Sequence, residues 1–221
     1  MKKITYQWIF KHLGKGRGEK LLDIGTGYGF ALLEAKRKGY QPVGIEPSPE
    51  LSKIASKAHG VKVINDFFEN VKFPIESFHL VSMFDSIEHM LNPQASLKKA
   101  AALVKPGGFL VITTPDINSL SAKLFYKYWF HLKNEHYYYF NKEILKNLLL
   151  KNGFTVKISM GQKRPLTLKY IENHFRIYPI PFLSITFRHL LSLVPTKIKN
   201  KIFTIYDGNL FMVAQKSVKI A

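Results

Sequence analysis

Three glycines at alternate positions follow an acidic residue near the start of the chain, in the run Leu21-Leu22-Asp23-Ile24-Gly25-Thr26-Gly27-Tyr28-Gly29. The apolar residues predict a buried strand. The glycines predict a tight turn that a ligand can approach closely, because no Cβ lies in the way. The residues after Gly29 predict a helix whose N-terminus points at the same place. We therefore expect a nucleotide-like ligand on this loop. Its candidate binding residues are Asp23, Gly25, Thr26, Gly27 and Gly29.

The glycine spacing differs from the dinucleotide-binding fingerprint, which is G-x-G-x-x-G. Gly29 comes one residue too early, Phe30 stands where the third glycine belongs, and Asp23 is no part of that fingerprint. The pattern D-x-G-x-G-x-G resembles motif I of the class I S-adenosylmethionine-dependent methyltransferases. The resemblance implies that the turn holds the methionine end of S-adenosylmethionine, which carries no pyrophosphate.

A second acid ends the next predicted strand, Pro42-Val43-Gly44-Ile45-Glu46-Pro47. Glu46 lies 23 residues after Asp23, which is about the separation at which an acid meets ribose hydroxyls in nucleotide-binding βαβ units. A carboxylate suits a 2′,3′-diol because it only accepts hydrogen bonds and the diol has two to donate. We predict cofactor contacts for Glu46 and Pro47. The alternative is an ordinary strand end that faces solvent.

The third predicted strand, Val61-Lys62-Val63-Ile64, leads to Asp66 and Phe67. In the family that the chain resembles, an Asp at this place meets the adenine amino group and the next apolar side chain packs on the ring. The resemblance therefore implies adenine contacts for both residues. The alternative for Asp66 is an acid in a surface turn. Phe84, which ends the fourth predicted strand at 78–84, is a further candidate cofactor contact.

An acidic and histidine-containing group, Asp85-Ser86-Ile87-Glu88-His89, follows the fourth strand. If a helical turn begins at Asp85, its carboxylate shares a face with Glu88 and His89, because positions i, i+3 and i+4 are neighbours on a helix. Two carboxylates and an imidazole can bind a hard divalent cation such as Mg²⁺. His136 or His131 is a candidate for a further ligand. The predicted metal ligands are Asp85, Glu88, His89 and His136.

The same residues allow two other interpretations. Without a metal, His89 or His136 is a candidate general base, and alternatively the Glu88-His89 pair braces its turn and touches no substrate. With Asn92-Pro93 and Lys105-Pro106-Gly107-Gly108, the block resembles small-molecule methyltransferases, including those of ubiquinone biosynthesis. It is also similar to the metal-binding group of small-RNA 2′-O-methyltransferases, although an Asp replaces their first Glu.

Strand-like and helical segments alternate along the 221 residues, which predicts right-handed βαβ crossovers within one domain over residues 1–221. The expected fold is α/β and Rossmann-like, a mostly parallel seven-stranded sheet with helices on both faces and an antiparallel last strand. Residues 4–13 predict an amphipathic helix on the sheet edge. The chain has no cysteine and no apolar run of the ~20 residues that a transmembrane helix needs, so a cytoplasmic location is expected.

A long segment, about 160–208, separates the sixth predicted strand, 154–159, from the last, 209–216. Apolar residues at 183, 187, 190, 191 and 194 form a helical stripe, and three lysines follow at 197, 199 and 201. This combination within 180–201 suits a helix at a membrane surface, with the protein peripheral to the membrane. It equally suits a cover over the site or contact with a partner chain, and core packing is the outcome most expected for such a stripe. The sequence leaves the oligomeric state open.

The net charge is +18, from 33 basic and 15 acidic residues. Such a charge attracts polyanions, but the lysines are spread along the chain without an RNA-binding signature run. The expected function is methyl transfer from S-adenosylmethionine to a small-molecule or lipid-linked acceptor, with oxygen as the favoured acceptor atom. The competing interpretations are an RNA 2′-O-methyltransferase and a non-catalytic cofactor-binding or membrane-scaffold protein.

Overall fold

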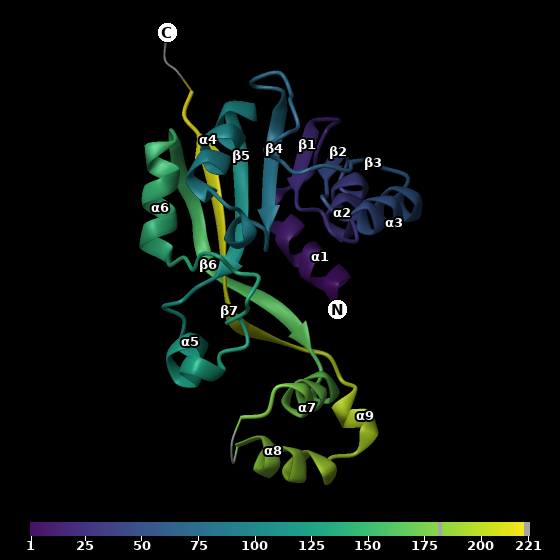
Figure 1. Cartoon of the computed structure of the whole chain (residues 1–221). Coiled ribbons are helices and arrows are strands. Elements are labelled where there is room, and N and C mark those ends of the chain that lie inside the picture. Colours follow the sequence, from purple (N-terminus) through teal and green to yellow (C-terminus); the bar gives the residue numbers. More distant parts are fainter. Residues whose placement is uncertain (181–182, 219–221) are drawn as a thin grey trace.

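Seven strands form one sheet in the order β3-β2-β1-β4-β5-β7-β6, with helices on both faces (Figure 1). The computed structural model describes residues 1–180 and 183–218. The pairs among β3, β2, β1, β4 and β5 are parallel, and β7 is antiparallel to both β5 and β6. The expected fold class is confirmed.

The strands are β1 (Lys20–Ile24), β2 (Gln41–Ile45), β3 (Lys62–Ile64), β4 (Phe78–Phe84), β5 (Val104–Pro115), β6 (Phe154–Leu166) and β7 (Phe203–Lys216). The α-helices are α1 (Lys2–Leu13), α2 (Phe30–Arg37), α3 (Pro49–His59), α4 (Pro93–Leu103), α5 (Leu120–Phe125), α6 (Lys142–Lys151), α7 (Leu168–Ile177), α8 (Leu183–Ser192) and α9 (Thr196–Lys199). Two short 3₁₀ turns are η1 (Ile87–His89) and η2 (Tyr126–Tyr128).

The core lies on both faces of the sheet, because successive strand side chains point to opposite sides. Leu22 of β1 packs in a cluster with residues of α4 and α6, whereas its neighbour Leu21 packs with residues of α1 and α2. The helix expected at 4–13 is present as α1, but its expected place at the sheet edge is wrong. It covers a face, where the ring of Trp8 lies 5.2 Å from that of Phe211 in β7.

The segment expected as an insertion at 160–208 begins and ends in strand, because β6 and β7 continue past the predicted limits. Their pairing extends from Lys163 opposite Tyr206 to Leu166 opposite Phe203. This ribbon carries α7, α8 and α9 away from the sheet (Figure 1). We call residues 160–208 the arm. Positions 181 and 182 of the predicted membrane segment lie outside the described residues.

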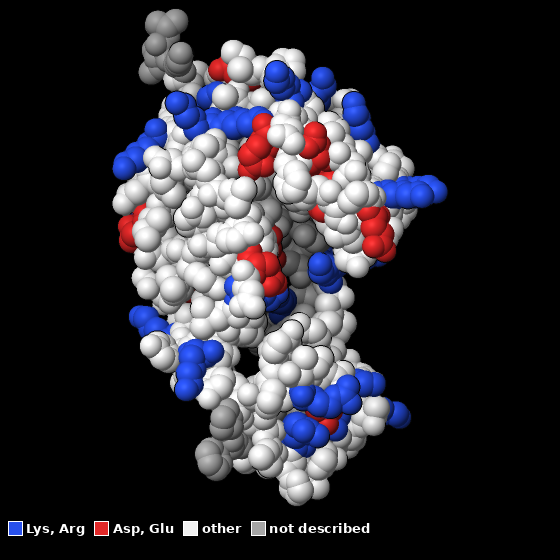
Figure 2. Space-filling model, viewed as in Figure 1, with Lys and Arg blue, Asp and Glu red and all other residues white. Residues whose placement is uncertain are grey.

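In Figure 2, basic side chains lie mainly along the upper and outer edges of the body and gather again over α7 and α9 in the tip of the arm, the part formed by α7, α8 and α9. The molecule is hollowed where the arm meets the body, and acidic side chains lie at the edge of the hollow. Among the described residues, no helix combines the length and the apolar character needed to span a bilayer.

Candidate functional site

The glycine loop between β1 and α2 lies at the carboxyl end of the parallel strands, where open α/β sheets bind ligands. Gly25 and Gly27 have φ angles of 77° and 52°, a region that side chains disfavour. A Cβ on Gly25 would lie 2.7 Å from the Cβ of Ser86, whereas one on Gly27 would meet no atom within 4 Å. The loop therefore packs tightly at its start and leaves open space at Gly27.

Asp23 lies buried beneath this loop. Its carboxylate accepts hydrogen bonds from the hydroxyls of Thr26 at 2.5 Å and Ser82 at 2.6 Å. Burial raises the pKa of Asp23 to about 6, although both hydroxyls act in the opposite direction. Asp23 and Thr26 thus hold the loop in shape from behind, and a direct contact of Asp23 with a ligand stays a prediction.

Glu46 spans from the end of β2 to the glycine loop. Its Oε2 accepts from the Gly27 N–H at 2.7 Å, and its Oε1 accepts from the Ser48 N–H at 3.0 Å. Each carboxylate oxygen can accept two hydrogen bonds, so a lone pair remains on each for a diol. The residues present therefore fit a ribose beside the open space at Gly27.

A cavity of about 750 Å³ opens in front of the loop. We call it the glycine-loop cavity, and its walls include Gly25, Glu46, Pro47 and Phe67. The structure thus brings together four of the predicted cofactor residues. The Asp66 carboxylate instead accepts from the Phe67 N–H and from Asn70, both at 2.7 Å, and its adenine contact stays a prediction.

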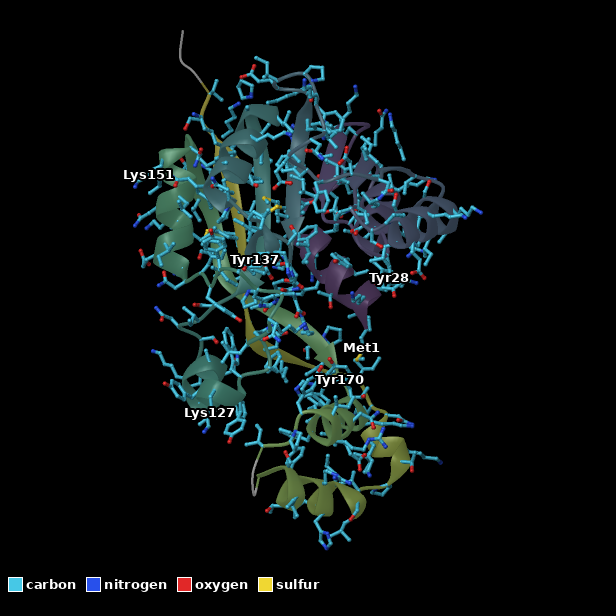
Figure 3. All side chains as sticks on the ribbon, in the orientation of Figure 1. Met1, Tyr28, Lys127, Tyr137, Lys151 and Tyr170 are labelled. Atoms are coloured by element: carbon cyan, nitrogen blue, oxygen red, sulfur yellow. The ribbon has the colours of Figure 1, made fainter. Side chains whose placement is uncertain are left out.

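A second cavity of about 420 Å³, the polar cavity, adjoins the first. Its walls come from α1, from the ends of β4 and β5, and from the arm. Met1 and Tyr170, which both line it, come from parts of the chain that are distant in sequence and approach each other in Figure 3. Asp85 and His89 line both cavities. Phe84 lines this cavity, where its ring lies 5.5 Å from that of Tyr6.

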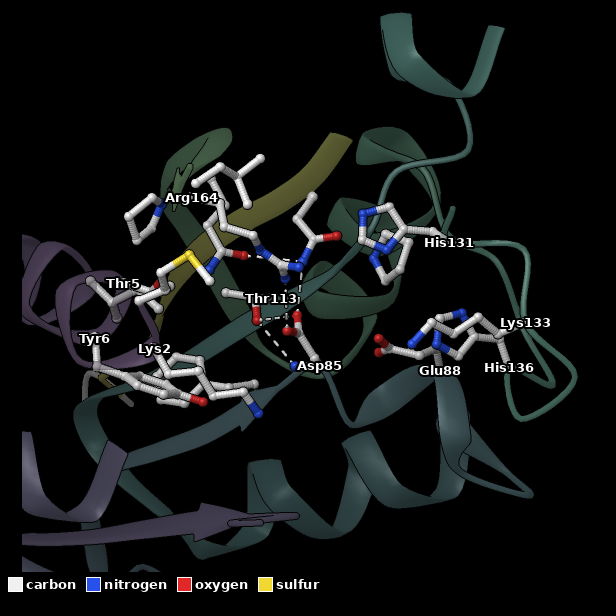
Figure 4. Close-up of a pocket in the computed structure, with 18 of the residues that line it drawn as sticks. Lys2, Thr5, Tyr6, Asp85, Glu88, Thr113, His131, Lys133, His136 and Arg164 are labelled. Atoms are coloured by element: carbon white, nitrogen blue, oxygen red, sulfur yellow. Dashed lines mark hydrogen bonds and ion pairs between the residues drawn. The ribbon is translucent and has the colours of Figure 1, made fainter. Parts of the chain in front are cut away.

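The expectation that Asp85 shares a face with Glu88 and His89 is not met. Asp85 has a φ of 48°, and the helical turn η1 begins only at Ile87. The Asp85 carboxylate accepts from Thr113 at 2.8 Å and Asn209 at 3.0 Å, and it lies 3.4 Å from Arg164. Figure 4 shows Asp85 beside Thr113 and Arg164, apart from Glu88 and His136.

Glu88, His89 and His136 do come together, with their potential ligand atoms within 4.8 Å of one another. Burial raises the pKa of Glu88, which accepts a hydrogen bond from Thr114 at 3.0 Å. Burial also lowers the pKa of His136. One carboxyl group that favours its protonated form and two imidazoles do not suit Mg²⁺, which prefers several oxygen ligands. The donor set therefore does not fit the predicted magnesium site.

Two further histidine features bear on the chemistry. Nδ1 of His89 lies 2.8 Å from the Glu135 carbonyl oxygen, and a carbonyl only accepts, so Nδ1 carries the proton and Nε2 keeps a free lone pair. His131 is buried, and its Nε2 has no hydrogen-bond partner in the described part of the chain. Burial lowers the pKa of His131 to about 3, which keeps it neutral.

Sequence reasoning missed the contribution of the arm to this site. Nε of Arg164 in β6 lies 2.6 Å from the Asp207 carboxylate in β7, and Asn209 donates to both Asp85 and Gln162. A signal for the β7 residues was present, because Asp207 and Asn209 immediately precede the apolar run of the last strand. Arg164 and Gln162 carried no comparable signal.

Comparison with known proteins connects these features to one family. The family model described as "Methyltransferase domain" matches residues 6–157 and so excludes the arm. The chain is 32% identical over 123 residues to a demethylmenaquinone methyltransferase of Chlorobaculum tepidum, covering 54% of this chain and 51% of that protein. It is 35% identical over 119 residues to a ubiquinone biosynthesis O-methyltransferase of Rhodopseudomonas palustris, covering 52% and 47%.

The chain thus spans about half the length of the curated relatives that it matches. A solved S-adenosylmethionine-dependent methyltransferase of Methanosarcina mazei superposes with a TM-score of 0.61 at 17% identity, covering 95% of this chain and 98% of that one. At this identity the structural likeness supports the fold alone.

Proposed function

Because this chain belongs to the class I S-adenosylmethionine-dependent methyltransferases, we propose that it transfers a methyl group from S-adenosylmethionine to an oxygen of a small or lipid-linked acceptor. The observation that carries the proposal is the pair of adjoining cavities that share Asp85 and His89. One cavity is lined by Gly25 at the start of the glycine loop and by Glu46, and the other offers a separate polar space for an acceptor.

The glycine-loop cavity would hold the cofactor. The open space at Gly27 admits the ligand close to the backbone, Glu46 accepts from the ribose hydroxyls, and the exposed ring of Phe67 packs on the adenine. When bound, S-adenosylmethionine supplies a methyl group on a positively charged sulfur, so the carbon–sulfur bond breaks as the carbon–oxygen bond forms. The protein has to align the acceptor and exclude water.

His89 is the proposed general base. Its Nδ1–H is engaged by the Glu135 carbonyl, so Nε2 is the atom that takes the proton from an acceptor hydroxyl. Asp85 is held by Thr113, Asn209 and Arg164 and would orient that hydroxyl as a positioning residue. His136, whose ring centroid lies 4.8 Å from that of His89, completes the base side of the cavity. This route requires no metal ion.

The arm supports a lipid-linked acceptor as one form of this substrate class. Leu191, part of the predicted apolar stripe, is buried, whereas Ile185, Leu190 and Leu193 are exposed. The predicted stripe is therefore split: Leu191 packs within the arm, whereas Leu190 of the same stripe is exposed together with Ile185 and Leu193, in the segment that precedes Lys197 and Lys201. Such a surface suits the headgroup region of an anionic membrane.

The test is transfer of a labelled methyl group to sugars, quinols, lipids and RNA, each with and without a chelator. We expect transfer to a small or lipid-linked hydroxyl compound, unaffected by the chelator. His89→Gln should lower kcat roughly 10²- to 10⁴-fold, and the exposed His189→Gln serves as the control. Tight cofactor binding without transfer to any compound would overturn the proposal in favour of a non-catalytic protein, and transfer to RNA alone would favour the nucleic-acid interpretation.

A further inference from the structure

A third cavity, of about 200 Å³, adjoins the polar cavity but shares no lining residue with the glycine-loop cavity. We call it the aromatic cavity because rings and aliphatic side chains form most of its wall. The lining residues that matter most are Phe125, Tyr128, Phe130, Tyr170, Phe175 and Ile205.

The walls of the aromatic cavity come from two parts of the chain that are distant in sequence. Phe125, Tyr128 and Phe130 belong to α5, η2 and the following loop, whereas Tyr170 and Phe175 belong to α7 of the arm. The two walls meet where the ring of Phe130 lies 6.0 Å from that of His174, edge to face. The cavity therefore forms between α7 of the arm and the segment that contains α5 and η2.

The aromatic cavity lies directly beside the polar cavity, because the side chains of Arg164, Leu166 and Tyr170 line both. Arg164 brings no unpaired charge to this junction, since the carboxylates of Asp207 and Asp85 lie 2.6 Å and 3.4 Å from its guanidinium. A molecule that extends from the polar cavity past this junction passes from hydrogen-bonding groups into an apolar environment.

Part of this apolar wall is left uncovered by the protein. Tyr128, Tyr170 and Ile205 all line the cavity and yet remain exposed. Covering such surface is favourable in proportion to its apolar area, and aromatic rings contribute large areas. A ligand with an apolar part would therefore gain affinity here, and a fully polar ligand would not.

We propose that the aromatic cavity binds an apolar substituent of the methyl acceptor while the reacting oxygen lies at His89 in the polar cavity. The acceptor is then an amphipathic molecule with a hydroxylated head and an alkyl or aromatic tail. This inference rests on the proposed function, because it assigns the head of the same molecule to the polar cavity.

The experiment uses n-alkyl esters of 3,4-dihydroxybenzoate, from methyl to octyl, and the benzyl ester. Binding to the full chain is measured by calorimetry with S-adenosylhomocysteine present, and methyl transfer is measured in parallel. We expect Kd to fall by about threefold to fourfold for each added methylene until the cavity is filled. Tighter binding of the benzyl ester than of the heptyl ester would show that the aromatic cavity prefers an aromatic substituent. Tighter binding of the heptyl ester would show that it prefers an alkyl chain.

Ile205→Glu places a carboxylate in the aromatic cavity and should remove the dependence of Kd on chain length. Ile202→Glu is the matched control, because Ile202 is 49% exposed against 37% for Ile205 and lines none of the three cavities. In the control, Kd should depend on chain length as it does in the wild type. Equal Kd values for methyl and octyl esters, absence of binding by every ester, or the same loss in the control would overturn the proposal.

The two proposals fail in different ways. Binding that strengthens with chain length but leads to no methyl transfer supports the aromatic cavity and counts against the proposed activity. Methyl transfer that proceeds with the same Kd and KM for every ester supports the proposed activity. It also shows that the aromatic cavity does not bind the acceptor.

Discussion

The carboxylate of Glu46 connects the end of β2 to the glycine loop. Glu46 is buried at the end of β2, and its Oε2 accepts from the Gly27 N–H. The same group is therefore both a brace for the loop and an acceptor for a diol. Its identity as a carboxylate matters because every hydrogen bond at this point is donated to it.

We expect Glu46→Gln to weaken binding of S-adenosylhomocysteine by roughly 10- to 100-fold, because the amide nitrogen cannot accept and a hydrogen bond to a charged group contributes about 1.5–3 kcal/mol. Calorimetry of the wild type and the variant measures the change. The exposed Glu50→Gln, in the first turn of α3, is the control and should bind as the wild type does. An unchanged Kd in Glu46→Gln would remove the ribose contact.

Asp23 gives a pH dependence of stability whose sign follows from burial. Its pKa is about 6 in the folded protein and about 3.9 in an unfolded chain. Between these values the folded state binds more protons, so the contribution to stability is present below about pH 4 and is lost as the pH rises through about 6.

Asp23→Asn removes this titration: one of the two hydroxyls, of Thr26 or of Ser82, can rotate to accept from the amide nitrogen while the other still donates to the amide oxygen. We expect the variant to gain about 3 kcal/mol on the wild type between about pH 4 and pH 7. Urea unfolding across this range measures the difference. Glu50→Gln, at an exposed carboxylate in the first turn of α3, is the control, and a parallel pH dependence for Asp23→Asn and the wild type would contradict the assignment.

Spacing in the sequence was sufficient to predict where Asp23 and Glu46 lie, because both follow strands of a regular βαβ unit. It was not sufficient for Asp85. The direction of that side chain depends on a left-handed backbone and on Arg164 and Asn209, which lie 79 and 124 residues further along the chain. Contacts of that range leave no local pattern.

A side chain at Gly25 and a side chain at Gly27 would have different consequences for the glycine loop. At Gly25 a side chain would overlap with Ser86, whereas at Gly27 its Cβ would meet no atom within 4 Å. Stability and ligand binding should therefore respond differently to the same substitution at the two positions.

We expect Gly25→Ala to lower the free energy of unfolding by about 2–4 kcal/mol, from the left-handed backbone and the overlap together. Gly27→Ala should lower the free energy of unfolding by only about 1–2 kcal/mol, from the backbone alone. The ratio of lost affinity for S-adenosylhomocysteine to lost stability should nevertheless be larger for Gly27→Ala than for Gly25→Ala. Chemical unfolding and calorimetry on both variants provide the comparison. Equal ratios of lost affinity to lost stability would show that Gly27 does not face the ligand.

The arm shows why strand ends were predicted less well than strand existence. β6 continues through Gly161 and Pro165, two residue types that usually end a strand. Pro165 is tolerated because β6 is the edge strand of the sheet and has β7 as its one neighbour. The long pairing with β7 overrides local preference, and only the tertiary structure contains that information.

At the scale of the whole molecule, the family match ends at residue 157, and the arm at 160–208 follows it. The body carries the glycine loop and the candidate base. The arm closes one side of the polar cavity, places Arg164 beside Asp85, and carries basic side chains at its tip (Figure 2). The proposed acceptor site is therefore built partly from a segment that the family match does not cover.

We expect the full chain to bind vesicles that contain anionic lipid through the tip of the arm, and to release them as salt is raised. Each lysine near an anionic surface contributes about 1 kcal/mol at low ionic strength, and salt screens this attraction. Flotation with anionic and with neutral vesicles, at low and at high salt, measures the binding. If the protein stays at the bottom of the gradient while anionic vesicles float at low salt, the arm has no membrane role.

A pair of variants separates apolar insertion from charge alone. Ile185→Ser with Leu193→Ser removes two side chains of the arm that are 72% and 80% exposed, whereas Ile75→Ser with Leu120→Ser removes two that are 75% and 81% exposed outside it. If apolar side chains enter the headgroup region, the first pair reduces flotation at high salt and the second leaves it unchanged. If charge alone holds the protein at the surface, both double variants float like the wild type at low salt. At high salt, neither the wild type nor either double variant then floats.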